Sequence, residues 1–441
     1  MKKIVLSLFV FAISANIVAA DHVMAATKRA PEKEVPATLN LSLQEAQDYA
    51  VAENRSLRNA DLAVQKAYAT RWQTIASMLP SVDMSWSFQS MMGYKMNFGG
   101  MPIEMPDNGT FGITASVGIN GQAIVGALLN NTAIEMQKLN LEISEDNLRA
   151  NVKSSYASVL VLEDVVKLLD NSLKNIEHLA AMTQRSVEVG AAEQTTADQI
   201  LVRVNTLKNN INANKRSTQL ALNALKVLLN VPAETELTLT TQLTDMLSAE
   251  AILTLLGHDF VLENNLSYQT LAKNVELAKK NVHMAGWAYG PTIGVGYQYS
   301  EKDYFGKKEG FNMTPPNALS IQVSMPLWSS GKRAAGVVEK KIALEEARNT
   351  FEETSDNLGI QNEQLRYNLQ NAFETYTNEQ ENIAVTQRVF DNTSRKFQQG
   401  VASNLDLVNA SNDLITAQST YVQAVLTLVN AEVELEKFLN L

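Results

Sequence analysis

The sequence offers few residues whose types and spacing suit catalysis or metal binding. Its four histidines are His22, His178, His258 and His283, and none pairs with another at a metal-ligand spacing on a helix. Cysteine is absent, which excludes a catalytic thiol, a thiolate zinc site and a disulfide scaffold. The sequence has no nucleophile elbow, phosphate-binding loop or zinc signature. His258 adjoins Asp259 without a nucleophile and is predicted to be structural, so neither an enzyme nor a cofactor is predicted.

A second kind of chemistry is offered by a methionine cluster in residues 91–105. Thioether sulfurs suit Cu(I), so a role in metal export is one interpretation. The interpretation that we favour is a mobile, adaptable outer loop, because methionine side chains pack flexibly. The cluster consists of Met91, Met92, Met96, Met101 and Met105.

The composition of the chain indicates which partners and which kinds of secondary structure to expect. The formal charge is −10 and the pI is about 5.1, which argues against nucleic acid as a main partner. The chain has 10 prolines, but none lies between Pro106 and Pro232 and none follows Pro326. Long proline-free stretches of this composition predict unusually long helices.

The N-terminal residues 1–20 have the pattern of an export signal. Lys2 and Lys3 precede an apolar run over 4–17, which is too short for a comfortable membrane span. Small residues predict cleavage after Ala20 or after Ala26; the alternative is an uncleaved anchor. Residues 21–40 are predicted to form an extended lead-in. No other stretch reaches about 18 consecutive apolar residues, so no transmembrane helix is predicted.

The chain repeats itself after about 210 residues. Gly190 matches Gly400, and the pair Leu229-Asn230 matches Leu439-Asn440. The segment Val51-Ala52-Glu53-Asn54 likewise recurs as Val261-Leu262-Glu263-Asn264. A period this long indicates a duplicated half-protein. We therefore predict a first repeat over 41–230, a linker over 231–250 and a second repeat over 251–441.

Four segments alternate strictly between apolar and polar residues, which predicts strands over 81–89, 111–120, 292–300 and 319–327. Each has the length of a tilted strand crossing a bilayer, so one face is predicted to meet lipid. Aromatic residues near the strand ends suit a membrane interface; the alternative is a soluble sheet on a layer of helices. The lipid-facing residues would include Val82, Met84, Trp86, Phe88, Ile293, Val295, Tyr297 and Tyr299, and the interfacial girdle Trp287, Tyr289 and Trp328.

Four strands are too few to close a barrel in a membrane, where open edges cannot exist. Two copies would supply eight strands, whose interior side chains would fill, whereas three copies would supply about 12 and leave a lumen. We therefore predict a mixed α and β membrane protein that forms a trimeric, 12-stranded barrel.

Two helices are predicted to be far longer than a single domain core requires. Residues 123–188 and 333–398 would each span about 100 Å. Apolar residues recur every seven positions, as in Leu369, Tyr376 and Ile383, which predicts coiled-coil packing. Each long helix is expected to end at a left-handed glycine, Gly190 or Gly400, so that each repeat forms a helical hairpin with its tip there.

Taken together, these residues resemble the TolC-type outer-membrane efflux proteins, and the resemblance covers nearly all of the mature chain. Three sets of residues carry it. The opening helix has Leu43-Gln44-Glu45-Ala46; the exit from the strands has Met325-Pro326-Leu327-Trp328 and Gly331-Lys332-Arg333; the closing hairpin has Gly400, Asp406, Leu407, Ala410 and Leu414.

The resemblance implies a homotrimeric channel-tunnel that crosses the outer membrane and extends into the periplasm. A long helical coiled-coil barrel would adjoin the strands, and residues 231–250 with the lead-in would form an equatorial belt. Such a protein is a passive, gated exit duct in a tripartite efflux or type I secretion system. Its partners would be a periplasmic adaptor (membrane fusion) protein and an inner-membrane pump of the RND, ABC or MFS type, and its cargo small molecules or proteins.

The resemblance also implies a periplasmic gate made of acidic rings at the helical tips. Asp406 matches one such acid, whereas the next matching position is Asn409. In the first repeat the corresponding position is Thr196, and Asp198 is displaced by two residues. One acidic ring is therefore implied; the alternative is that Asp406 complements the dipole at a helix N-terminus.

Two other classes of protein compete with this interpretation. A coiled-coil adaptor or adhesin predicts a single hairpin and no duplicated strand pairs. A periplasmic enzyme predicts a catalytic site, for which the sequence has no candidate.

Overall fold

The computed structural model describes residues 37–104, 106–190, 192–305 and 315–441. The predicted signal, most of the lead-in and Met105 lie outside the described residues. The chain divides into two compact units. The sheet unit contains Leu62–Lys138 and Thr270–Glu352. The hairpin unit contains the described part of Lys28–Asp61 together with Leu139–Gln269 and Glu353–Leu441.

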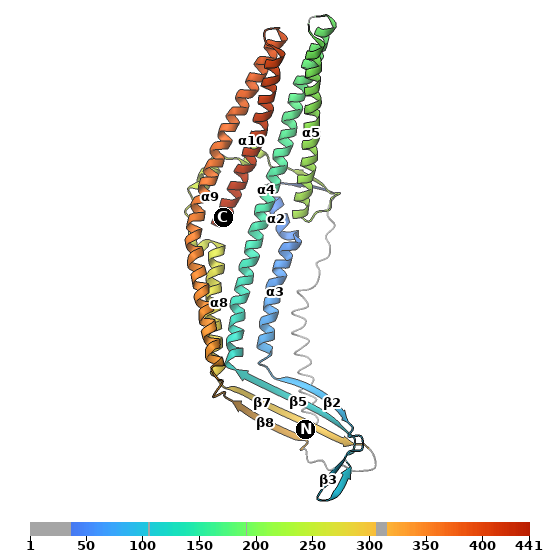
Figure 1. The fold of residues 1–441 in the computed structure, drawn as a ribbon, viewed down its shortest axis with the longest axis vertical. Helices are drawn as coiled ribbons and strands as arrows, with labels where there is room; N and C mark the ends of the chain where they lie inside the picture. Colours follow the sequence, from blue (N-terminus) through green and yellow to red (C-terminus); the bar gives the residue numbers. More distant parts are fainter. Residues whose placement is uncertain (1–36, 105, 191, 306–314) are drawn as a thin grey trace. The chain divides into compact units, whose positions relative to one another are not determined.

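The order of elements repeats once along the chain: shorter helices, a strand pair, a very long helix and a shorter helix (Figure 1). The first part comprises β1 (Thr38–Leu41), α2 (Leu43–Glu53), α3 (Arg55–Ala76), β2 (Ser81–Gln89), β3 (Lys95–Phe98), β4 (Met101–Glu104), β5 (Asn108–Asn120), α4 (Gly121–Glu188) and α5 (Gln194–Leu228). The second comprises β6 (Glu236–Leu239), α6 (Leu243–Met246), α7 (Ala249–Leu256), η1 (Leu262–Asn264), α8 (Leu266–Gly286), η2 (Trp287–Tyr289), β7 (Thr292–Tyr304), β8 (Asn317–Ser324), α9 (Lys332–Gln398) and α10 (Asn404–Leu439).

The sheet unit is built on an antiparallel four-stranded sheet in the order β2-β5-β7-β8. The strand pairs of the two repeats therefore join through β5 and β7. Strand β5 starts earlier than the sequence predicts and β7 ends later, whereas β8 ends at Ser324 and not at 327. Pro326 explains the early end, because proline has no N–H to donate to a strand ladder.

The methionine-rich segment between β2 and β5 differs from the expected loop. Strands β3 and β4 pair in an antiparallel hairpin, with Met96 opposite Ile103 and Phe98 opposite Met101. The side chains of Met92 and Met101 are 94% and 73% exposed. The described residues of this segment thus form a β-hairpin in which the side chains of Met92 and Met101 are exposed to solvent.

A polar cluster holds α4 against α8 in the sheet unit. Thr132 is 1% exposed, and its hydroxyl accepts a hydrogen bond from Lys280 at 2.6 Å and donates one to Glu276 at 3.2 Å. The side-chain hydrogen bond from Lys280, followed by one from Lys273, lowers the pKa of Glu276 to about 2. Glu276 is therefore ionised at any physiological pH.

The hairpin unit contains four antiparallel helical segments whose contacts give the order α9, α10, α4, α5 (Figure 1). The rings of Tyr376 and Tyr421 join α9 to α10 with centroids 5.9 Å apart. Lys153 of α4 forms an ion pair with Glu432 of α10. Two hydrophobic clusters fill the interior of this unit, and their fully buried members include Val152, Leu225, Leu369, Val425, Leu428 and Leu435.

Local signals explain where these helices begin and end. Ser42 and Glu45 form a reciprocal capping box at the start of α2, and Ser403 and Asp406 form another at the start of α10. Such boxes satisfy backbone N–H groups that have no partner within the helix. Beyond the ends of α4 and α9, Gly190 and Gly400 have φ of 75° and 73°, a conformation that disfavours residues with a Cβ.

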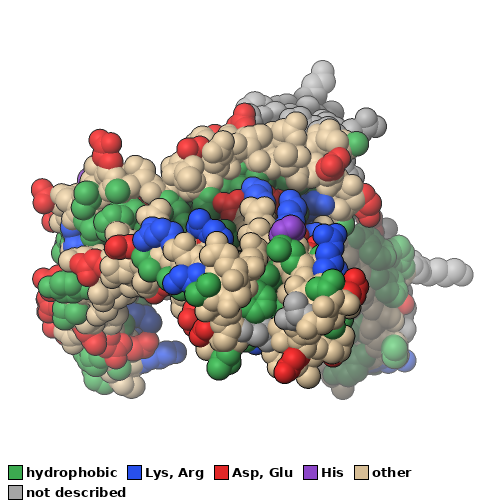
Figure 2. All heavy atoms as spheres, turned by 90° about the horizontal axis from the view of Figure 1, so that it is seen from above, with side chains coloured by type: hydrophobic (Ala, Val, Ile, Leu, Met, Phe, Trp, Pro, Cys, Tyr) green, Lys and Arg blue, Asp and Glu red, His purple; other side chains and the backbone are tan. Residues whose placement is uncertain are grey.

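Many large hydrophobic side chains lie open on the isolated chain. Figure 2 shows one face, on which hydrophobic side chains lie beside Lys, Arg, Asp and Glu. On the sheet, Trp86 is 68% exposed and Leu319 is 70% exposed. In the part of the chain that the structure describes, none of the helices is long and apolar enough to cross a membrane.

Candidate functional site

The register of the sheet unit places its apolar residues on a single face. Val82 pairs with Ala115, Met84 with Ile113 and Trp86 with Phe111, and directly paired residues project to the same side. Strands β7 and β8 continue this face with Ile293 opposite Val323, Val295 opposite Ile321 and Tyr297 opposite Leu319. The other face carries small and polar residues, among them Ser85, Ser87, Thr114, Gly294, Gln298, Ser320 and Gln322.

The apolar face is uncovered in the isolated chain. On β2, Val82, Met84, Trp86 and Phe88 are between 47% and 68% exposed. Strands β2 and β8 are the two edges of the sheet, and in the described residues neither has a second neighbour. A soluble protein rarely exposes an apolar patch of this extent, so such a face marks contact with lipid or with another chain.

Three aromatic residues lie where the sheet adjoins the helices of the same unit. Trp287 packs over the backbone of Gly121, where an added Cβ would come within 2.1 Å of the indole ring. The guanidinium of Arg333 lies 5.1 Å from the ring centroid of Tyr289, and this arginine also donates to the carbonyl of Pro326 at 2.6 Å. Trp328 is 85% exposed. Whether these rings form a membrane girdle stays a prediction.

The helical tips contain the residues assigned to the gate. The carboxylate of Asp406 accepts hydrogen bonds from the Ser403 hydroxyl at 2.7 Å and from its N–H at 2.9 Å. These bonds, first from the side chain and then from the backbone, hold the pKa of Asp406 below its usual range. Asp406 therefore remains ionised and caps its own helix. Asn409 is exposed on α10, and Thr196 is half-buried on the first turn of α5.

The short elements β1, β6, α6 and α7, together called the belt, contact the long helices α4 and α9 of the hairpin unit. Strands β1 and β6 pair in parallel. The hydroxyl of the fully buried Tyr156 donates to the carbonyl of Leu41 at 2.9 Å and accepts from the N–H of Thr241 at 3.1 Å. On α9, the guanidinium of Arg366 donates to the carbonyls of Leu256 and His258. Tyr156 of α4 and Arg366 of α9 thus each hold the belt through a polar side chain, and no sequence motif marks either residue.

Two asparagines connect helix starts to helix ends in the same unit. The side-chain oxygen of Asn54 accepts from the N–H of Ser56 at 2.8 Å, and its amide donates to the carbonyl of Leu228 at 2.8 Å. Asn265 repeats this arrangement with Ser267 at 3.0 Å and Phe438 at 2.9 Å. The sequence match of Asn54 with Asn264 is therefore wrong by one residue, because the hydrogen bonds make Asn265 the counterpart.

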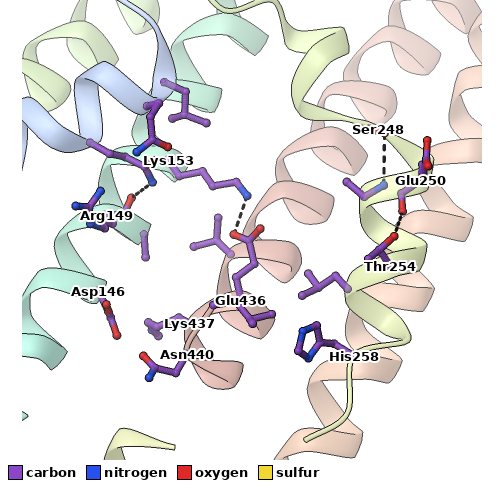
Figure 3. A pocket seen from close by; sticks show the side chains of 18 residues that line it. Asp146, Arg149, Lys153, Ser248, Glu250, Thr254, His258, Glu436, Lys437 and Asn440 are labelled. Carbon is purple, nitrogen blue, oxygen red and sulfur yellow. Dashed lines mark hydrogen bonds and ion pairs between the residues drawn. The ribbon is translucent and has the colours of Figure 1, made fainter. Parts of the chain in front are cut away.

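The groove shown in Figure 3 lies in the belt region of the hairpin unit and has a volume of about 810 Å³. Its lining includes Asp146, Arg149, Lys153, Glu436 and His258. Two cations of this groove each form ion pairs with two carboxylates. The ammonium nitrogen of Lys153 lies 2.9 Å from a carboxylate oxygen of Glu432 and 2.7 Å from one of Glu436. The guanidinium of Arg149 lies 2.9 Å from a carboxylate oxygen of Asp48 and 3.1 Å from one of Glu145. This arrangement suits a structural ion network and contains no nucleophile with an adjacent base.

Glu432 and Lys153 form the most deeply buried ion pair of this network. Burial raises the pKa of Glu432, and the attraction of Lys153 offsets that shift only in part. For Lys153, burial favours the neutral amine, but Glu432 and Glu436 together outweigh it and raise the pKa. Two carboxylates share one ammonium, so the group carries one surplus negative charge.

No group of three or more metal-ligating carboxylates and histidines occurs among the described residues. The predicted absence of a metal site or cofactor is not tested by this observation.

An exposed apolar sheet face, together with long helical hairpins, is typical of a membrane-associated protein with a helical extension. The model of the family described as "Outer membrane efflux protein" matches residues 47–231 and 259–441. The chain belongs to this family, so the resemblance inferred from the sequence is confirmed. It is a subunit of an outer-membrane efflux channel that extends into the periplasm, and the family and fold are those of channels and not of enzymes.

Curated relatives and solved structures agree with this assignment. The probable efflux pump outer membrane protein TtgC of Pseudomonas putida is 23% identical over 428 residues, covering 90% of this chain and 83% of TtgC. The outer membrane efflux protein BepC of Brucella suis is 23% identical over 297 residues, covering 66% of this chain and 63% of BepC. The solved structure of VceC from Vibrio cholerae superposes with a TM-score of 0.72 at 15% identity, covering 90% of this chain and 95% of VceC. As outer-membrane components of efflux pumps, such proteins work with further pump components.

Proposed function

We propose that three copies of this chain form a gated exit duct. Each copy would supply four strands to a 12-stranded barrel in the outer membrane and two hairpins to a helical barrel in the periplasm. The duct would receive small molecules or proteins from an inner-membrane pump of the RND, ABC or MFS type through a periplasmic adaptor. The pump would supply the energy.

One observation carries this proposal: a four-stranded sheet with an exposed apolar face and two unpaired edges. Hydrocarbon excludes unpaired backbone groups, so the edges must pair with those of other copies. The experiment is purification in detergent, followed by measurement of the oligomeric mass and of conductance in planar bilayers. A trimer that conducts ions is expected. A water-soluble monomer without conductance would contradict the proposal.

In this assembly the apolar face meets lipid. Val82, Met84, Trp86, Phe88, Ile293, Val295, Tyr297 and Tyr299 would form part of the lipid-facing band, with Trp287, Tyr289 and Trp328 at one interface. The register supports this assignment because it places the strand residues of both repeats on the same side. The polar face would line the lumen.

The lipid-facing assignment is tested by Met84→Arg. Near the middle of the strand, an arginine on the lipid face is expected to destabilise the inserted protein by about 2–4 kcal/mol. Ser87→Arg is the matched control, because Ser87 lies on the same strand but on the polar face. Urea unfolding in lipid vesicles measures both. Equal stability of the two variants would contradict the assignment.

At the tips, we infer that Asp406 of three copies forms one acidic ring, with Asn409 and Thr196 in the positions where relatives would carry further gate residues. Three carboxylates near a narrow axis attract cations, and salt screens this attraction over about 8 Å. Because Asp406 also caps α10, a test must separate the charge from the cap.

Two variants make this separation in single-channel recordings. Asp406→Asn removes the charge and is expected to weaken block by multivalent cations. Ser403→Ala keeps the charge but removes the hydroxyl that completes the capping box, so block should persist. If Ser403→Ala weakened block as much as Asp406→Asn, the carboxylate would be a structural cap and not a gate residue.

A further inference from the structure

Acidic residues are missing from the segments where the helices and strands of the sheet unit join. Each of four segments contains a strand end and the end of the helix that adjoins it, and none of the four contains Asp or Glu. The whole chain, by contrast, has a formal charge of −10. The segments are 62–82, 111–134, 277–300 and 317–338, and their Lys and Arg residues are Lys66, Arg71, Lys279, Lys280, Lys332 and Arg333. These joints therefore form a local basic region in an acidic protein.

The two basic residues at the start of α9 have no counter-ion among the described residues. Lys280 of α8 is compensated, because its ammonium lies 2.6 Å from a carboxylate oxygen of Glu276. Lys332 and Arg333, in contrast, form no ion pair with any residue that the structure describes, and the ion pairs of α9 lie further along the helix. Two adjacent positive charges are thus open to an anionic partner.

Arg333 is held in a fixed orientation by uncharged groups. Its guanidinium donates to the carbonyl of Pro326 at 2.6 Å and to the hydroxyl of Ser329 at 3.0 Å. It also lies 5.1 Å from the ring centroid of Tyr289. A guanidinium has five N–H donors in a planar fork, so these two bonds leave donors for a ligand. Such a fork matches two oxygens of a phosphate group.

The turn that precedes α9 also exposes two large hydrophobic side chains. Leu327 is 89% exposed and Trp328 is 85% exposed, although side chains of this kind are stabilised by removal from water. The N–H of Lys332 donates to the carbonyl of Ser329 at 2.9 Å and closes the turn. Two hydrophobic side chains and two cations therefore share one short segment, residues 326–333, which we call the basic turn.

The basic turn continues the apolar face of the sheet. Apolar residues still alternate beyond the end of β8, so that Val323, Met325 and Leu327 are 66%, 60% and 89% exposed at every second position. The face that is proposed to meet lipid thus leads directly into the turn. Tryptophan beside basic residues is typical of the level at which hydrocarbon gives way to lipid headgroups.

The first repeat indicates that the fold does not require these charges. Helix α4 follows β5 as α9 follows β8, but α4 starts with Gly121-Gln122-Ala123 and α9 with Lys332-Arg333-Ala334. The two helices have nearly the same length, 68 and 67 residues. The segment 111–134 contains no charged residue. The basic pair is therefore particular to the second repeat and is not needed to start a long helix.

Charge and hydrophobicity together select the kind of partner. A free anion would match Arg333 but would leave Leu327 and Trp328 in water. An anionic phospholipid presents a phosphate next to acyl chains, which matches a guanidinium next to exposed leucine and tryptophan side chains. Of these two ligands, only the lipid accounts for both features of the turn.

We propose that the basic turn binds the phosphate group of an anionic phospholipid in the membrane leaflet on the helical side of the sheet. Arg333 is the phosphate ligand, and Lys332 adds attraction for the negative headgroup. Leu327 and Trp328 enter the boundary of the acyl chains. This inference rests on the proposed lipid-facing sheet and adds a lipid class and a binding site. Such a contact would set the depth of each copy in the membrane.

Brominated phosphatidylglycerol is the probe, because bromine quenches tryptophan fluorescence on contact. The full-length protein is reconstituted in phosphatidylcholine vesicles that contain a rising share of the brominated lipid. The part of the quenching that is lost in Trp328→Phe reports on the turn and gives its preference for phosphatidylglycerol. One cation near a membrane surface strengthens the binding of anionic lipid about fivefold. Arg333→Gln is therefore expected to lower the preference about fivefold.

Two further variants separate the lipid contact from effects on folding. The side chain of Lys332 is exposed and forms no hydrogen bond or ion pair with the described residues, so Lys332→Gln removes a charge without disturbing the turn. It should also lower the preference about fivefold. Arg348→Gln is the matched control, because Arg348 is an exposed residue further along α9 that pairs with Glu345 at 3.4 Å. This control should keep the preference of the parent protein.

The outcomes distinguish the inference from the proposed function. Equal preferences in Lys332→Gln, Arg348→Gln and the parent would overturn the inference. Inorganic phosphate, added at constant ionic strength, should leave the quenching unchanged; a loss would indicate a site for free anions and contradict the lipid assignment. If the protein inserts and conducts without preferring phosphatidylglycerol, the inference is wrong and the duct stands. If the protein does not insert into vesicles, both fail.

Discussion

Replacing Lys153 with alanine is expected to destabilise the hairpin unit by about 3–5 kcal/mol. The side chain of Lys153 is 13% exposed and that of Glu432 is 7% exposed, so the substitution leaves a buried carboxylate without its cation. Glu436 is 33% exposed and can turn toward water, so it contributes less. Denaturant unfolding of the purified protein, followed by circular dichroism, measures the loss.

Lys167→Ala is the matched control for this prediction. Lys167 pairs with Asp164 on the surface of the same helix, where the two side chains are 72% and 51% exposed. An exposed pair of this kind contributes at most about 1 kcal/mol. If the two variants lost equal stability, the ion pair of Lys153 with Glu432 would have no special structural role.

The loss in Lys153→Ala should also depend on pH. Burial raises the pKa of Glu432 in the folded protein above its ordinary value of 4.5. A raised folded pKa means that stability from binding the proton is present at low pH and is lost as the pH rises through the folded pKa. Without Lys153, protonation is the remaining way to neutralise Glu432. The difference between variant and parent should therefore shrink as the pH falls toward 4.5.

Replacing Asn265 with alanine is expected to destabilise the hairpin unit by about 2–4 kcal/mol. Asn265 is 6% exposed, and its side chain bonds to the N–H groups of Ser267 and Tyr268 and to the carbonyl of Phe438. Alanine would leave three backbone groups without these partners. Because the bonds connect the start of α8 to the end of α10, thermal unfolding of the hairpin unit measures the effect.

The neighbouring Asn264 provides the control. Its side chain is exposed, and Asn264→Ala is expected to change the stability by less than about 0.5 kcal/mol. Asn54→Ala should resemble Asn265→Ala, since Asn54 makes the corresponding bonds in the first repeat. If Asn264→Ala lost more stability than Asn265→Ala, Asn264 would be the counterpart of Asn54, as the sequence match suggests. That result would contradict the assignment of Asn265 from its hydrogen bonds.

Sequence patterns determined the features that depend on neighbouring residues. The alternation in β2 sets which side chains share a face, because successive strand residues point to opposite sides. Gly190 and Gly400 mark the ends of the long helices, because a left-handed residue is most accessible to glycine. The early end of β8 was also within reach of the sequence, since Pro326 interrupts the ladder.

Tertiary structure alone decided the contacts between residues far apart in the chain. Lys153 meets Glu432, which lies 279 residues away, and Tyr156 meets Leu41, which lies 115 residues away. A seven-residue period shows that a helix has an apolar stripe, but the period is the same in every register and for every neighbour. Only the packed helices select the partner, because burial makes one alignment of charges and hydrogen bonds much more favourable than the others.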